Sequence, residues 1–291
     1  ANMALDFIFI KFGKLGIFGA GLATVIGFAI GGATPLIYFL FSKKSRIKLR
    51  ATKFYPKKLL SACFNGASEF MSNVSASLVG ILYNVQLVKM VGEKGIAAYS
   101  AMMYIDFVFL AVFFGFTMGI APVISYNYGS NNFKEMKSVF KKSTAIIVIG
   151  SAVACALAEA LSYPLTYAFV GYNKELLDMS LRGFRIFSAC YLFCGINIWC
   201  SAFFTALCNG ALSALISFLR SLVFRGGAVM LLPLIFDLDG IWSAVIVAES
   251  LTAAISVLLF VLNRKRYRYG NEEVAVESVF NNELDIKECN Q

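Results

Sequence analysis

Residues 97–121 read AAYSAMMYIDFVFLAVFFGFTMGIA, and a single charged side chain, Asp106, interrupts them. About 20 apolar residues in a helix cross the roughly 30 Å hydrocarbon core of a bilayer. A stretch of this length and composition therefore predicts a membrane-spanning helix. The whole chain has the same character, since 59% of its 291 residues are hydrophobic and only 15% are charged, against about 25% charged in soluble domains.

Six further stretches of this kind lie on either side of the first. The expected spans are 17–41, 59–83, 97–121, 143–170, 184–207, 211–235 and 240–263. The apolar region from 184 to 235 is too long for one span, and the turn signal Cys208-Asn209-Gly210 divides it. The predicted fold class is therefore an all-α integral membrane protein. Residues 1–10 are apolar but too short to cross a bilayer, so we interpret them as the end of a span that begins upstream.

Basic residues gather in three clusters that each follow a span. They are Lys43, Lys44, Arg46, Lys48, Arg50, Lys53, Lys57 and Lys58; Lys134, Lys137, Lys141 and Lys142; and Arg264, Lys265, Arg266 and Arg268. A net charge of +9 can indicate nucleic-acid binding. Each cluster abuts an apolar run, however, so cytoplasmic flanks of a cell-membrane protein fit better, and no nucleic-acid partner is expected. The C-terminus is then cytoplasmic, and its acidic end is a polar tail.

An internal repeat relates the first complete span to the last. Residues 16–20 (GIFGA) match residues 240–244 (GIWSA), and both segments open a span that runs into a basic stretch. If the repeat is real, residues 17–41 end a first repeat and residues 59–263 form a whole second repeat of six spans. Parallel repeats of this kind are typical of transporters.

Several motifs resemble the multidrug and toxic compound extrusion (MATE) family. They are NMALD at 2–6, GIFGAGLAT at 16–24, GIAPVISYNYG at 119–129, ALCNG at 206–210 and SFLR at 217–220. Phe7 stands where the family often has Pro. The resemblance implies twelve spans in two six-helix lobes, of which roughly the first four and most of the fifth would be absent here.

The resemblance also implies domains and a function. Residues 1–41 would end the N-terminal lobe, 42–58 would be a basic cytoplasmic linker, 59–265 the C-terminal six-span lobe and 266–291 a cytoplasmic tail. Members of the family export cationic or amphipathic compounds against an inward flow of H⁺ or Na⁺. The expected partners are a small-molecule substrate and membrane lipid, and the full-length protein is expected to be a monomer.

The amino-acid composition argues against most classes of enzyme. The chain has no His, which excludes an HExxH zinc site and a His-based triad. Its seven cysteines form no CxxC pair, and six of them lie in apolar runs, where Cys packs as a small hydrophobe. We therefore expect no enzyme, no metal site and no cofactor other than the coupling ion.

Acidic side chains within the spans are the main candidates for coupling. An ionised side chain at mid-bilayer costs about 2.5–3.5 kcal/mol on insertion scales, so it needs a cavity, a partner or a proton. From the expected span limits, Glu69, Asp106 and Glu249 each lie about 14–15 Å deep, near the midplane. Glu159 lies in the outer half.

Glu69 is the leading candidate because it belongs to a polar stripe. Asn65, Glu69, Ser72, Asn73 and Ala76 share one helical face. The resemblance adds that the family often has a Glu near this position, tied to cation coupling or drug binding. The predicted cation- or substrate-binding residues are Glu69, Asn65, Asn73, Asp106, Asn197 and Glu249.

One departure from the family pattern concerns sodium coupling. Sodium-type members pair the Glu with an Asp in the tenth span, whereas residues 186–207 contain no acid and Asn197 is their only strongly polar group. Cationic partners for these acids are available in Arg182, Arg185, Arg220 and Arg225, of which Arg220 is deep enough to neutralise one of them. The choice between H⁺ and Na⁺ therefore stays open.

Two other classes of protein also fit the spans. A lipid-linked oligosaccharide flippase of the same superfamily would need a cavity rich in Arg and Lys, whereas the midplane set here is acidic. A seven-span receptor fits the count of complete spans, but the half-span at 1–10 and the repeat argue against it.

Overall fold

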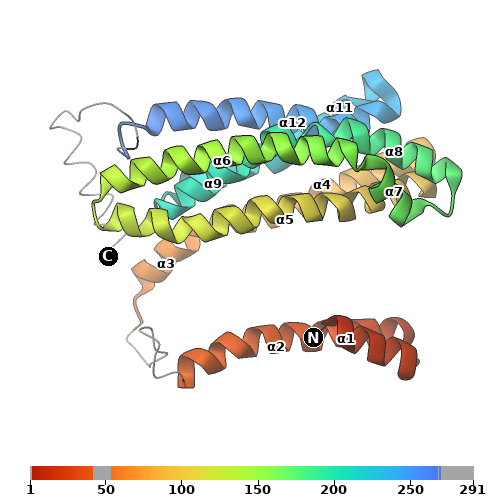
Figure 1. The fold of residues 1–291 in the computed structure, drawn as a ribbon, viewed down its shortest axis with the longest axis horizontal. Helices are drawn as coiled ribbons and strands as arrows, with labels where there is room; N and C mark the ends of the chain where they lie inside the picture. Colours follow the sequence, from red (N-terminus) through yellow and green to blue (C-terminus); the bar gives the residue numbers. More distant parts are fainter. Residues whose placement is uncertain (1, 42–53, 268, 270–291) are drawn as a thin grey trace. The chain divides into compact units, whose positions relative to one another are not determined.

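The computed structural model describes residues 2–41, 54–267 and 269, with the side chains of 64, 65, 67 and 68 left out. Every regular element in these residues is a helix (Figure 1). The chain divides into two compact units, Ala1–Tyr55 and Pro56–Gln291. Most of the predicted linker 42–58 and tail 266–291 lies outside the described residues, so those domain boundaries stay predictions.

Unit 1 is a helical hairpin. It contains α1 (Asn2–Asp6), the π-helix η1 (Phe7–Phe12) and α2 (Gly16–Phe41). Positive φ angles at Lys14 (50°) and Gly16 (53°) reverse the chain between η1 and α2. The side chains of Asn2 and Thr24 are hydrogen-bonded at 3.2 Å, so two of the quoted family motifs meet across the hairpin.

Unit 2 contains the remaining helices. They are α3 (Pro56–Asn65), α4 (Ala67–Val91), α5 (Glu93–Gly129), α6 (Phe133–Ala160), α7 (Ser162–Val170), α8 (Lys174–Ser188), α9 (Tyr191–Ala206), α10 (Gly210–Phe218), η2 (Leu219–Gly226), α11 (Gly227–Leu231) and α12 (Pro233–Asn263). Helix α12 is kinked at Phe236 and Asp237, whose backbone angles are not helical.

The predicted spans are confirmed as apolar helices. In the described residues, six helices are long and apolar enough to cross a membrane, and a seventh span results if the bent pair of α8 and α9 counts as one. Two limits differ clearly from the prediction: α4 ends at Val91 rather than near 83, and the span predicted at 143–170 is α6 at Phe133–Ala160, because the helix ends at its C-cap Leu161 and α7 begins at Ser162. Gly66 separates α3 from α4, and hydropathy alone does not mark such a division.

Asparagine begins three of these helices. The side-chain oxygens of Asn132, Asn173 and Asn209 accept hydrogen bonds from the backbone N–H groups of Glu135, Leu176 and Leu212, at 3.3, 3.2 and 3.1 Å. Such N-caps satisfy donors that the first turn leaves open. Asn209 lies in the predicted turn at 208–210, which the structure confirms between α9 and α10.

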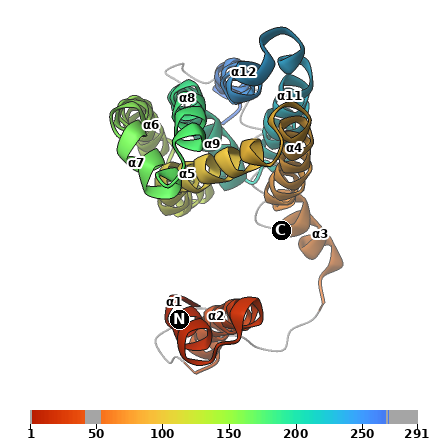
Figure 2. The ribbon, with the colours of Figure 1, turned by 90° about the vertical axis from the view of Figure 1, so that its right-hand side faces the viewer.

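Helix α9 lies at the centre of unit 2. It packs against α5, α6, α10 and α12, as the end-on view in Figure 2 shows. Its side chains Tyr191, Trp199 and Phe203 are fully buried. A Cβ at Gly195 would lie 2.2 Å from Ser151 Oγ and 2.9 Å from the Phe113 ring, so glycine permits the close approach of α9 to α5 and α6.

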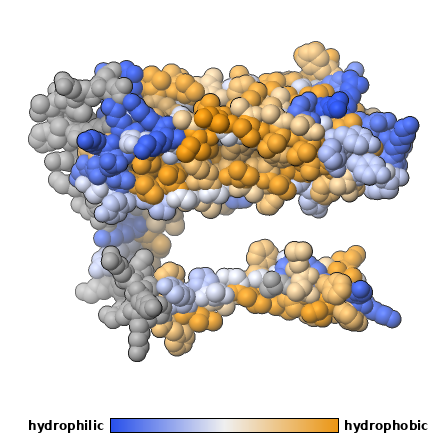
Figure 3. Space-filling model, viewed as in Figure 1, coloured by the Kyte–Doolittle hydropathy of each residue, from blue (hydrophilic) through white to orange (hydrophobic). Residues whose placement is uncertain are grey.

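The two ends of unit 2 differ in charge. The lysines at the start of α6 and the basic residues after α12 lie at the same end, where Asn209 Nδ2 donates to Tyr267 Oη at 2.6 Å. The opposite end carries cross-helix ion pairs, Lys94 with Glu175 at 2.5 Å and Arg182 with Asp239. A hydrophobic band separates the hydrophilic ends (Figure 3).

Candidate functional site

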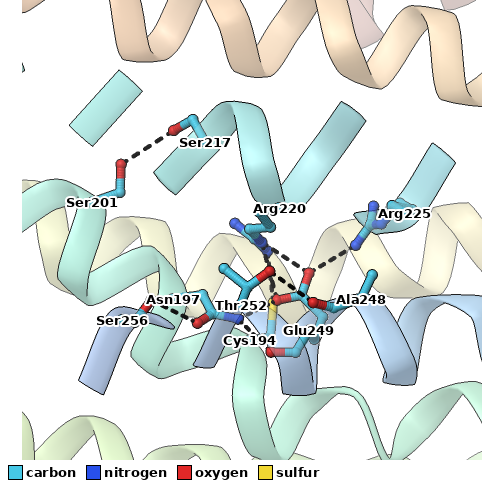
Figure 4. A network of polar contacts seen from close by, with 10 residues as sticks. All are labelled: Cys194, Asn197, Ser201, Ser217, Arg220, Arg225, Ala248, Glu249, Thr252 and Ser256. Carbon is cyan, nitrogen blue, oxygen red and sulfur yellow. Dashed lines mark hydrogen bonds and ion pairs between the residues drawn. The ribbon is translucent and has the colours of Figure 1, made fainter. Parts of the chain in front are cut away.

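A π-helical segment supplies two arginines to the interior of unit 2. Arg220 and Arg225 lie five residues apart in η2. Five residues in an α-helix would separate them by more than a third of a turn, whereas the i→i+5 hydrogen bonds of a π-helix bring them onto one side. Both side chains therefore point toward α12 (Figure 4).

Glu249 of α12 forms ion pairs with both arginines. Its side chain is fully buried. Arg220 Nε donates to Glu249 Oε1 at 2.8 Å and to Oε2 at 3.0 Å, while an Arg225 terminal nitrogen donates to Oε1 at 2.9 Å. Arg220 also donates to Cys194 Sγ at 3.1 Å.

Asn197 extends the network into α9. Its Nδ2 donates to Glu249 Oε2 at 2.7 Å and to the Glu249 carbonyl at 2.9 Å. Ser256 Oγ in turn donates to Asn197 Oδ1 at 3.0 Å. The carboxylate is thus held from η2 and α9 at once, and both of its oxygens accept more than one hydrogen bond.

The network gives the buried Glu249 carboxylate both a counter-charge and hydrogen-bond donors. A buried charge is tolerated only when it is paired and its remaining acceptors are hydrogen-bonded, and removal of one partner costs about 3–5 kcal/mol. Two guanidinium groups face one carboxylate, so the three side chains carry a net charge of +1. The interior of the lobe therefore has a positive excess at this point.

A second buried carboxylate lies nearby. Asp106 of α5 is 7% exposed and accepts a hydrogen bond from Tyr191 Oη at 3.0 Å. It interacts electrostatically with Arg225 and Glu249. Tyr83 of α4 and Tyr99 of α5 stack beside the same arginine, with ring centroids 4.6 Å apart.

Glu69 and Asn73 lie elsewhere, on an exposed face of α4. Asn73 Nδ2 donates to the Glu69 backbone carbonyl at 2.8 Å. Ser77 and Asn84 continue the exposed stripe at helical spacing. Glu69 belongs to the first turn of α4, and its depth within the membrane stays a prediction.

The structure thus separates the predicted site residues into three groups. Asn197 and Glu249 are in direct contact, Asp106 lies in the same interior, and Glu69 and Asn73 are on the surface. The side chain of Asn65 lies outside the described residues. Arg220 neutralises an acid as expected. Arg225, also an expected cationic partner, meets the same acid as Arg220, which a spacing of five in an α-helix does not predict.

No metal centre is present among the described residues, since no three Cys, Asp or Glu side chains gather in a way that could hold an ion. The charged side chains of the interior are instead paired with one another around Glu249. This arrangement can hold η2, α9 and α12 together through one buried carboxylate.

Curated relatives of this chain are multidrug export proteins. The multidrug export protein MepA of Staphylococcus aureus (strain bovine RF122) is 26% identical over 282 residues, and that of Staphylococcus saprophyticus is 24% identical over 283 residues. Each match covers 94% of this chain and 60% of the relative. The chain therefore spans about three fifths of the length of these relatives.

Solved structures share the fold. A crystal structure of MATE in complex with MaL6 matches with a TM-score of 0.84 at 17% identity, over 92% of this chain and 61% of that chain. The outward-facing conformation of a multidrug resistance MATE family transporter matches with a TM-score of 0.82 at 18% identity, over the same shares. These likenesses confirm the predicted all-α membrane fold.

The sequence model of one family covers the central part of the chain. It is the MatE family, and the match extends over residues 68–226, from the start of α4 to the end of η2. This region carries Arg220, Arg225, Asn197 and Asp106. Because the match covers more than half of the sequence, this chain belongs to the MatE family.

Proposed function

We propose that this chain supplies the C-terminal lobe of an exporter that removes cationic or amphipathic compounds from the cell, driven by an inward flow of H⁺ or Na⁺. Family membership and the multidrug export relatives support this proposal. The basic residues at one end of unit 2 support an orientation in which that end and the C-terminus are cytoplasmic.

The polar stripe on α4 is the observation that carries the proposal. Glu69, Asn73, Ser77 and Asn84 are all exposed on one face of a helix whose other exposed side chains are apolar, apart from Lys89 in its last turn. A carboxylate and amides facing lipid would be costly, so such a face is expected to line water or bound cargo. Its single charge is negative, which suits a cationic compound.

The paired state of the interior arginines counts against the flippase alternative. A lipid-linked oligosaccharide carries pyrophosphate, and its carrier needs cationic side chains free to bind it. Both Arg220 and Arg225 instead donate to Glu249. A receptor function is incompatible with membership of the family.

The test uses the full-length transporter in everted membrane vesicles. We expect Glu69→Gln to reduce uptake of a cationic dye, driven by a pH or Na⁺ gradient, at least tenfold, because the amide keeps the shape but cannot attract or release a cation. Glu159→Gln is the matched control, since Glu159 is also an exposed acid within a span and accepts a hydrogen bond from Ser188 at 3.2 Å.

Two results would decide whether the polar stripe on α4 takes part in transport. Loss of transport with Glu69→Gln but not with Glu159→Gln supports a cargo or coupling role for the stripe. Full gradient-driven uptake by Glu69→Gln would remove this role and transfer coupling to the interior carboxylates or the other lobe.

A further inference from the structure

The basic stretch that follows α12 sends its tyrosines into the lobe. Residues 264–269 read RKRYRY. The three basic side chains at 264–266 are exposed, whereas Tyr267 is 2% and Tyr269 is 4% exposed. Basic residues interleaved with aromatic rings can indicate a nucleic-acid surface, on which the rings stand free to stack on bases. Both rings are buried here, so this stretch has another role.

Tyr267 connects the segment after α12 with α5, α9 and α10. Its hydroxyl accepts a hydrogen bond from Asn209 Nδ2 at 2.6 Å. The other end of the same amide, Asn209 Oδ1, caps α10. The Tyr267 ring lies 6.0 Å from the ring of Tyr128 in α5 and 6.2 Å from the ring of Phe204 in α9. Both polar ends of the Asn209 side chain are thus in use, one for the helix and one for the tyrosine.

Tyr269 completes an aromatic layer between α6, α9 and α12. Its ring centroid lies 4.6 Å from that of Phe140, 5.1 Å from that of Phe203 and 6.4 Å from that of Phe260. The three phenylalanine rings also contact one another, at 4.9, 5.2 and 5.7 Å. The Tyr269 hydroxyl donates to the Phe260 carbonyl at 2.7 Å, so this buried group is satisfied. Each of the four rings therefore contacts the other three.

A polar layer lies directly beneath these rings. Cys200 of α9 and Ser256 of α12 are about one helical turn deeper than the phenylalanines of the same two helices. Cys200 Sγ contacts the Ser256 carbonyl at 3.5 Å. Ser256 Oγ donates to Asn197, which donates to Glu249 (Figure 4). The aromatic layer therefore separates the buried ion pairs from the basic end of unit 2, where the lysines of α6 and the residues after α12 lie.

We propose that Tyr267 and Tyr269 form a C-terminal plug, which closes the basic end of the lobe over its buried charged residues. Tyr269 supplies one ring of the aromatic layer, and Tyr267 fastens the segment to the turn between α9 and α10. Ion pairs are stronger where water is excluded, so the closed plug preserves the network around Glu249. The plug holds for either orientation of the lobe in a membrane and does not depend on the proposed export function.

The native thiol of Cys200 reports whether the plug is closed. Cys200 is fully buried, so we expect N-ethylmaleimide to modify it slowly in the purified full-length protein. Tyr269→Ala removes one ring from the layer above this thiol. We expect the rate of modification at Cys200, located by mass spectrometry of its peptide, to rise at least tenfold. Tyr269→Phe keeps the ring and should keep the thiol as protected as in the wild type.

Two controls distinguish an opened plug from a loosened lobe. Tyr126 is an exposed tyrosine in the last turns of α5, so Tyr126→Ala should leave Cys200 protected. Cys194 is also buried and lies about 9 Å deeper along α9, so it should stay protected in every variant. If Tyr269→Ala does not fold, Tyr269→Leu, which keeps an apolar side chain without a ring, gives the same comparison.

Two outcomes of the labelling would overturn the proposal. In the first, Cys200 stays as protected in Tyr269→Ala as in the wild type, which means that the ring does not close this end. In the second, Cys194 and Cys200 become reactive together, because a general loosening of the lobe exposes both thiols.

A double-mutant cycle tests how the plug is fastened. Tyr267→Phe removes the hydroxyl, and Asn209→Ser retains an oxygen for the helix cap but removes the amide donor. Each change should lower Tm of the full-length protein. The double variant should lose less than the sum, because both single changes break the same hydrogen bond. Additive losses would contradict the fastening of Tyr267 to this turn.

Discussion

Two glutamates within spans of this chain differ in burial and in hydrogen bonding. Glu249 is fully buried and accepts hydrogen bonds from three side chains, whereas Glu69 lies exposed at the start of α4. Hydropathy treats both as one charge in an apolar run. The difference teaches that two glutamates which hydropathy cannot tell apart can be a fully paired part of the interior or an exposed side chain without an ion pair.

The largest effect should separate these two glutamates. Glu249→Ala leaves two buried guanidinium groups without their carboxylate, so we expect a loss of about 3–5 kcal/mol in stability. Glu69→Ala should change Tm by less than about 2 °C, because exposed positions have small effects. Thermal unfolding of the purified full-length protein measures both. Equal losses of stability in the two variants would show that burial and pairing do not distinguish Glu249 from Glu69.

The next effect concerns the amide that completes the buried site. Asn197→Ala removes the hydrogen bond to Glu249 Oε2 and leaves Ser256 without its acceptor, so we expect a loss of about 1.5–3 kcal/mol. Asn73→Ala, at the exposed stripe, serves as the surface counterpart and should be nearly neutral in Tm. A neutral Asn197→Ala would show that the carboxylate does not need the amide.

A purely steric change tests how closely the buried helix α9 is packed, in contrast to the open surface. Gly195→Ala places a methyl group 2.2 Å from Ser151 Oγ and 2.9 Å from the Phe113 ring. We expect a cost of about 1–3 kcal/mol from overpacking. Gly150→Ala is the control, since a Cβ there meets no atom within 4 Å. Comparable Tm values for the two variants would argue against close packing of α9.

The smallest effect should come from the rim of the lobe. Asn173→Ala removes the N-cap of α8 and should cost about 1 kcal/mol. Asn173→Ser, which retains a capping oxygen, should recover most of this loss in the same Tm measurement. A loss as large as that of Asn197→Ala would mean that stability does not concentrate in the interior.

The sequence predicted the spans well because apolar length is a local property. The turn at 208–210 and the family motifs were also visible locally. The division between α3 and α4 at Gly66 was not, because hydropathy measures composition rather than the pattern of backbone hydrogen bonds. The depth predicted for Glu69 stays a prediction.

Single residues of the buried site could be predicted from the sequence, but their contacts could not. Asn197, Glu249 and Arg220 were each recognised as unusual within an apolar run. Their contact joins residues 52 and 29 positions apart in the sequence, which no periodicity reveals. Arg225 was counted among the available cationic partners, but its place beside Arg220 was not predicted, because it depends on a π-helix and α-helical spacing assigns Arg225 to another side.

The π-helix also makes this lobe sensitive to changes in chain length. A π-helical turn contains one residue more than an α-helical turn. Deleting a single residue such as Ser221 would let η2 relax into an α-helix and rotate the residues on one side of the deletion by about 100°. Related transporters that lack this extra residue would carry Arg225 on a different face of the helix. The presence or absence of one inserted residue would then separate lobes with this buried cluster from lobes without it, even where every arginine and glutamate is retained.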